Sequence, residues 1–79
     1  MTKETINLLR NLIEEKNSRL DAIGRKLAYL RKLTLEAKTH EELDIISHEV
    51  KDLGAEIESL VASRSALQGE INDFYRPAA

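Results

Sequence analysis

Hydrophobic residues recur along almost the whole chain with the alternating three- and four-residue spacing of a heptad repeat. Such spacing places an apolar stripe along an α-helix and is typical of helices that pack against another helix. The first half carries one series of ten positions: Ile6, Leu9, Ile13, Lys16, Leu20, Ile23, Leu27, Leu30, Thr34 and Ala37. The second half carries another: Leu43, Ile46, Val50, Leu53, Ile57, Leu60, Arg64, Leu67, Ile71 and Phe74. Seventeen of these twenty seam positions are apolar, so the sequence predicts helix-on-helix packing.

A change of heptad phase near the middle of the chain predicts a turn rather than one continuous helix. The first series, continued in steps of seven from Ile6, reaches Glu41, whereas the second series begins at Leu43. An offset of two is neither the three- nor the four-residue insertion that coiled coils absorb by local rewinding. Thr39 and Glu42 also have the spacing of a capping box, which marks the start of a helix. Two helices joined by a tight turn therefore fit the sequence best.

The two helices should pair in antiparallel fashion along their whole length. All ten seam pairs can be chosen so that their residue numbers add up to 80, as in Leu9 with Ile71 and Leu27 with Leu53. We therefore expect an all-α fold, an antiparallel two-helix coiled-coil hairpin that pairs into a dimer or four-helix bundle. The single domain, residues 1–79, divides into a helix over 3–38, a turn over 38–40, a helix over 40–75 and a tail over 76–79, where Pro77 stops the helix.

The charge distribution agrees with this pairing. Residues 1–38 hold nine Lys and Arg against five Asp and Glu, whereas residues 39–79 hold three against nine. A basic helix thus lies against an acidic one, with Lys26 and Glu56 as expected neighbours. The whole chain carries a net charge of −2, contains no cysteine and has no apolar run long enough to span a bilayer. These features argue against a polycation for nucleic acid, a disulfide-bonded domain and a membrane protein.

Two cations, Lys16 and Arg64, fall in the same layer of the predicted seam. Their long stems could leave the seam and cover neighbouring leucines. Alternatively, they could hold an anion or a partner carboxylate, or fix the register of the two helices at a cost in stability. The sequence leaves these three interpretations open.

Other residues outside the seam are candidates for contact with a partner. Gly24 and Gly54 lie on one flank at nearly the same level, where they either relieve crowding or let another helix approach closely. Six large apolar residues also fall off the seam: Leu8, Leu12, Tyr29, Leu33, Ile45 and Val61. We expect Tyr29, Leu33 and Ile45 to form a patch near the turn, and Leu8 and Leu12 another at the open end. Since a core this small rarely suffices alone, the patches favour self-association or docking to another protein.

The sequence offers no arrangement typical of an enzyme. It holds no Ser/His/Asp or phosphate-loop pattern, and His40 and His48 are too far apart for a helical metal pair. We therefore expect a non-enzymatic protein with no catalytic residue, cofactor or metal. A basic band formed by Arg25, Lys26, Arg31 and Lys32 permits a hairpin dimer that binds nucleic acid, but no docking motif or stacking aromatic supports it.

The run Ala37-Lys38-Thr39-His40-Glu41-Glu42-Leu43, followed by Ile45, Val50 and Ile57, resembles the N-terminal scaffolding (delta) domain of tailed-bacteriophage major capsid proteins. In that family a first helix leads to an AKT-x-EEL turn and a second heptad helix. The second helix ends in a segment similar to residues 64–72 of this chain. The resemblance covers about residues 3–74. Since the capsid fold would follow, it implies that this chain is a domain excised from a longer protein.

The resemblance implies a role in assembly. In that family the domain lies inside the immature shell, holds capsid subunits in assembly-competent clusters and is removed by a maturation protease. The resemblance also implies a location in the bacterial cytoplasm and procapsid interior. The off-seam patches and the Lys16/Arg64 layer would then be contact sites, and the tail from Arg76 would lead toward the capsid body. The alternative is a small free-standing homodimeric hairpin that acts as a regulator or adaptor, with protein partners and no membrane or nucleic acid.

Overall fold

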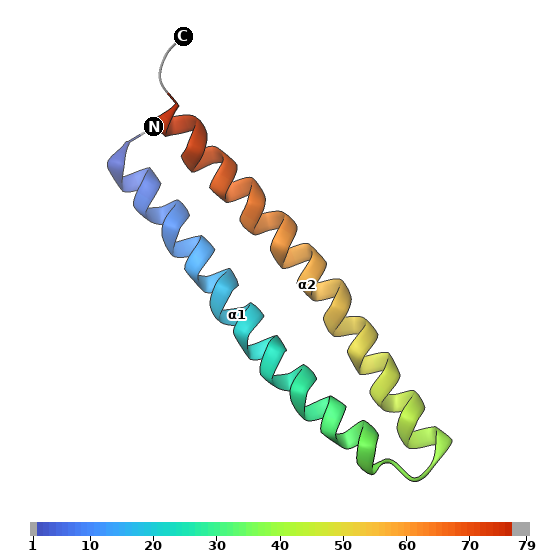
Figure 1. The fold of residues 1–79 in the computed structure, drawn as a ribbon. Helices are drawn as coiled ribbons and strands as arrows, with labels where there is room; N and C mark the ends of the chain where they lie inside the picture. The colour runs from blue at the N-terminus through green and yellow to red at the C-terminus, as the bar shows by residue number, and fades with distance from the viewer. Residues whose placement is uncertain (1, 77–79) are drawn as a thin grey trace.

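Two long helices lie side by side and form an antiparallel hairpin (Figure 1). The computed structural model describes residues 2–76. Helix α1 spans Lys3–Glu36 and helix α2 spans His40–Tyr75. The turn lies at one end of the rod, and the start of α1 lies beside the end of α2 at the other end. The all-α hairpin predicted from the heptad phase is therefore confirmed. Within the described residues, neither helix is apolar over a stretch long enough to cross a membrane.

Each helix begins at a threonine that caps its first turn. The Thr2 hydroxyl accepts a hydrogen bond from the backbone N–H of Thr5, and the Thr39 hydroxyl accepts one from Glu42. These bonds satisfy amide groups that have no partner within the helix. The Glu42 carboxylate accepts a hydrogen bond from the backbone N–H of Lys38 at 2.9 Å, one residue before the N-cap N–H that donates in a standard capping box. The predicted start of the second helix is thus correct.

The first helix ends two residues earlier than the sequence predicts, at Glu36 rather than at residue 38. Ala37 has an extended backbone, with φ −64° and ψ 136°, and Thr39 is extended as well. The extended backbone of Thr39 is the conformation that N-cap residues adopt, and the Glu42 carboxylate holds the N–H of Lys38 outside either helix. The reversal therefore occupies residues 37–39. Of the predicted tail, Arg76 caps α2, and residues 77–79 lie outside the described part of the chain.

The core is a single row of seam residues divided into two clusters. The cluster at the open end contains Ile6, Leu9 and Ile71, with Ile13 and Leu67 packed against it. The cluster toward the turn contains Ile23, Leu30 and Leu53, with Leu27, Leu33, Ile46, Ile57 and Leu60 packed against it. The Lys16/Arg64 layer lies between them in the seam, so the two cations interrupt the apolar packing.

The hairpin exposes more surface than a compact protein of its size. Its dimensions are 61 × 19 × 13 Å and its accessible surface is 6323 Å². A folded monomer of 9.0 kDa is expected to expose about 4,900 Å². The surplus of roughly 1,400 Å² arises because a two-helix rod can bury only one stripe of each helix.

Candidate interaction surface

Two different flanks border the seam. Residues directly before seam positions such as Leu20 and Leu27 lie on one side of the seam. Residues directly after seam positions such as Leu9 and Ile23 lie on the other side. On the first side, Arg19 pairs with Glu56 at 2.8 Å and Lys26 pairs with Glu49 at 2.7 Å. We call this side the charged flank. On the opposite side, the Arg10 guanidinium donates to the Tyr75 hydroxyl at 3.3 Å. We call that side the glycine flank, because Gly24 and Gly54 occupy it.

The ion pair between Arg19 and Glu56 is bidentate. The Arg19 Nε donates to Glu56 Oε1 at 3.0 Å and its Nη2 donates to Oε2 at 2.8 Å. The hydrogen bond from Arg19 is the largest cause that holds the pKa of the Glu56 carboxyl below its usual value, and the charge of Lys26 adds a smaller contribution. Lys26 was expected beside Glu56, yet its own ion pair is with Glu49. The residue numbers add up to 75 in each pair, which places both pairs on one antiparallel flank.

The two cations of the seam are both half-buried, and Arg64 turns out of the seam. Its Nη1 donates to the Asn17 side-chain oxygen at 2.8 Å, on the glycine flank. This is the arrangement expected of a long stem that covers apolar neighbours while its charge reaches a polar group. Within residues 2–76, no buried side-chain N or O atom lacks a hydrogen-bond partner. The geometry favours the covering interpretation over an anion held between the two cations.

The glycines on the glycine flank are not required by packing inside the hairpin. A Cβ added at Gly24 or Gly54 would meet no atom within 4 Å, so neither residue relieves crowding within this chain. Val61, on the same flank, leaves 37% of its surface exposed. The three residues thus lie on an open surface. The closer approach of another helix stays a prediction.

The remaining off-seam candidates lie on the charged flank. Leu8 and Leu12 lie near the open end and are 63% and 43% exposed, respectively. Tyr29 is 60% exposed and Ile45 is 72% exposed, both nearer the turn. Leu33 differs from these residues because it is half-buried and packs against the core cluster nearer the turn. The charged flank therefore has apolar residues toward both ends and ion pairs in between.

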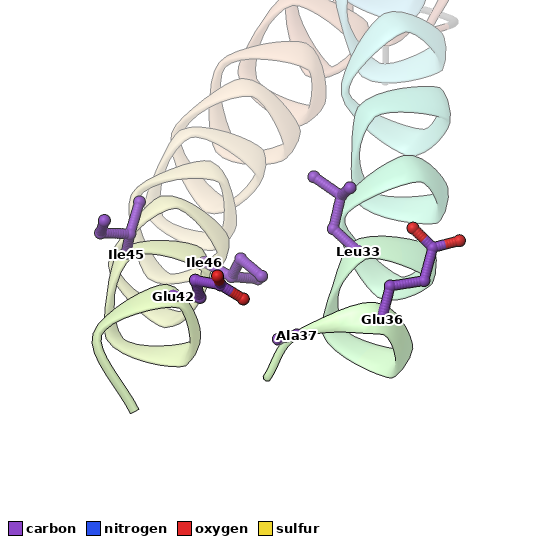
Figure 2. Close-up of a pocket in the computed structure, with 6 residues that line it drawn as sticks. All are labelled: Leu33, Glu36, Ala37, Glu42, Ile45 and Ile46. Carbon is purple, nitrogen blue, oxygen red and sulfur yellow. The ribbon is translucent and has the colours of Figure 1, made fainter. Parts of the chain in front are cut away.

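A shallow pocket of about 380 Å³ opens at the turn end of this flank (Figure 2). Its lining comes from both helices: Leu33, Glu36, Ala37, Glu42, Ile45 and Ile46. Leu33 and Ile46 point toward the opening between the helices, whereas Glu36 points away from α2. The pocket exists because small seam residues, Thr34 and Ala37, occupy the last layers of α1 and cannot fill the space opposite α2. Tyr29 is not part of the lining.

The sequence interpretation missed several residues of this surface. Glu36, Ala37, Glu42 and Ile46 were not recognised as pocket residues, although the small side chains in the last seam layers could have indicated an unfilled end. It also missed Leu35, which is 83% exposed outside the charged flank. Comparison of the chain with protein families, curated proteins and solved structures finds no match.

Proposed function

We propose that this chain is a non-enzymatic protein-interaction module of the scaffolding type, which holds larger protein subunits together during assembly. The observation that carries the proposal is the exposed apolar surface of the thin rod. Leu8, Tyr29 and Ile45 are each at least 60% exposed, and they lie on one flank of a rod that exposes roughly 1,400 Å² more total surface than a compact protein of its size. Such a surface is expected to bind protein, because exposed apolar patches mark interaction sites.

The resemblance to the capsid scaffolding domain makes this proposal specific. It is carried by the turn sequence from Ala37 to Leu43. The same turn contains the cap bonds of Thr39 and Glu42 that fix the hairpin. On this proposal the rod lies inside an immature shell in the bacterial cytoplasm and is removed once the shell is built.

The experiment is an immunoblot of the native gene product with an antibody against this segment, followed through particle maturation. The expected result is a band much larger than 9.0 kDa that loses the segment as particles mature. An antibody against the remainder of that larger product serves as the control, because its signal should persist. A stable free product near 9.0 kDa overturns the scaffolding proposal and favours the alternative, a free-standing dimeric adaptor.

Charge disfavours the nucleic-acid alternative. Of the basic band, Lys26 is paired with Glu49, and the neighbouring helix α2 is acidic. Nucleic-acid affinity depends on cations that are free to replace the counterions of phosphates. Binding of duplex DNA or RNA that weakens steeply as salt rises would support this alternative instead.

A further inference from the structure

We infer that the charged flank of α1 binds a second copy of this chain, with the two α1 helices antiparallel about a two-fold axis near the middle of the rod. This inference rests on the proposed function and names a partner for its exposed surface. It starts from a second heptad seam on α1, separate from the one that faces α2. That seam reads Leu8, Leu12, Glu15, Arg19, Ala22, Lys26, Tyr29 and Leu33.

The direction of this second seam suits a helix in a four-helix bundle. Successive residues of an α-helix are about 100° apart, so the second seam lies roughly 110° around α1 from the seam that faces α2. Two contact stripes about a quarter turn apart let one helix touch two neighbours at once. Leu8, Leu12 and Tyr29 are exposed along the second stripe, and Leu33 is half-buried.

The second seam is complementary to itself. Its spacing of four and three residues reads the same in both directions from a centre between Arg19 and Ala22. In an antiparallel copy, Leu8 therefore faces Leu33, Leu12 faces Tyr29, and Glu15 faces Lys26; each contact occurs twice in a two-fold pair. Apolar residues meet apolar residues at both ends, and Arg19 faces Ala22 at the centre. Next to this central layer, Glu15 would add a second carboxylate to Lys26, which already pairs with Glu49 in its own chain.

The pocket at the turn supports the same pairing. Its walls, Leu33 and Ile45, lie at the level of the rod where Leu8 of the second copy would arrive. The apolar side chain at the open end of each copy thus meets the unfilled turn end of the other. The rim carries two carboxylates, Glu36 and Glu42, and the residues before Leu8 in the second copy include Lys3.

The apolar ends of the α1 flank argue against the other symmetric arrangement. If the turns of both copies lay at the same end, α1 would face α2 of the second copy, and Leu8 would meet Glu70 and Asp73. Most positions of α2 on the charged flank are acidic or polar: Glu42, Glu49, Asp52, Glu56, Ser59, Ser63, Glu70 and Asp73. Contact between the two α1 helices is the arrangement that matches the flank.

Sedimentation equilibrium of the full chain and matched variants provides the first test. The parent is expected to sediment at twice 9.0 kDa. Leu8→Glu should weaken the dimer about tenfold or more, because each dimer places two carboxylates against apolar side chains. Tyr29→Glu provides a second disruptive variant, and Leu35→Glu is the control because Leu35 is exposed outside this flank. Circular dichroism verifies that each variant keeps its helices.

Engineered cysteines test the orientation, since the natural chain has no cysteine. In the proposed pair, Leu12 lies beside Tyr29 of the second copy but about 25 Å from Leu12 of that copy. A mixture of Leu12→Cys and Tyr29→Cys should therefore give a disulfide dimer, whereas neither variant alone should. A mixture of Glu14→Cys and Ala28→Cys, at similar levels outside the flank, is the matched control.

Several results would overturn the inference. They are a monomeric parent, equal dissociation of Leu8→Glu and Leu35→Glu, or cross-linking of Leu12→Cys with itself. A monomeric parent would remove the second copy as the partner but would leave the scaffolding proposal standing. That proposal depends on the size and maturation of the gene product, which the immunoblot measures independently.

Discussion

Replacement of the cation layer should join the two halves of the core. We predict that the double variant Lys16→Leu, Arg64→Leu is more stable than the parent. Full burial of a leucine contributes about 1.5–3 kcal/mol, so two half-buried leucines should contribute about 2 kcal/mol together. Loss of the exposed bond from Arg64 to Asn17 offsets part of this, at about 0.5–1.5 kcal/mol. The expected net gain is about 1 kcal/mol, with relief of like-charge repulsion added.

Urea unfolding followed by circular dichroism measures this gain. With a slope of about 1 kcal/mol per molar urea for a small protein, the midpoint should rise by roughly 1 M. Several protein concentrations are needed, because self-association also stabilises the folded chain. Lys32→Leu is the control, since it adds a leucine at an exposed position outside the seam and should change stability by less than about 0.5 kcal/mol.

A clear loss of stability in the double variant would refute the reasoning. It would mean that the cations do more than interrupt the core. Cross-linking of the double variant would then decide between the two remaining roles. Mixed helix registers would show that Lys16 and Arg64 fix the alignment of α1 with α2, as single polar seam residues do in other coiled coils. An unchanged register would favour a bound anion or partner carboxylate, which ion-dependent stability of the parent would reveal.

Three further predictions concern the turn, the glycines and acid. Thr39→Ala should lower the free energy of unfolding by about 1 kcal/mol through loss of the helix cap, and Thr39→Ser should restore most of it in the same urea assay. Gly24→Ala should raise the free energy of unfolding by about 1 kcal/mol, and so should the comparison variant Gly69→Ala, because an added Cβ meets no atom at either site. If Gly24→Ala weakened the dimer in sedimentation equilibrium and Gly69→Ala did not, the glycine flank would be an interface. The folded pKa of Glu56 is depressed by Arg19, so its contribution to stability is present above the unfolded pKa and is lost as pH falls through the folded pKa. A pH series of urea midpoints should therefore be flatter for Glu56→Gln than for Glu58→Gln, and equal slopes would contradict the assignment.

The seam and the turn could be predicted from sequence because each depends on local spacing. The phase offset between Ile6 and Leu43, together with the box at Thr39 and Glu42, was sufficient to place the reversal. The end of α1 was predicted less accurately, because it depends on how many extended residues the chain needs to reverse its direction. The actual partner of Lys26 also escaped prediction, because flank contacts follow a different numbering offset from seam contacts.

The candidate surface was predicted only in part. The exposed apolar residues could be named because they fall outside the heptad, yet Leu33 packs partly against the core. Small residues in the last seam layers could have indicated an unfilled end, but the side chains that line the pocket depend on how the turn brings α1 and α2 together. The sequence grouped Gly24 and Gly54 with Tyr29 as contact residues, but the hairpin places them on opposite flanks. A single partner helix therefore cannot contact both groups at once.

The start of α1 and the end of α2 lie at the same end of the rod, and this determines how the hairpin responds to tension. Force applied between Lys3 and Tyr75 would separate the helices one layer at a time, because only the outermost layer bears the load. Opening would pass through the cluster around Ile6 and Ile71 and then reach the cation layer, where little apolar packing resists it. A pull along one helix against the other would instead load all layers together. Bodies attached at the open end would thus peel the hairpin apart at low force, in two stages, before its helices slid past each other.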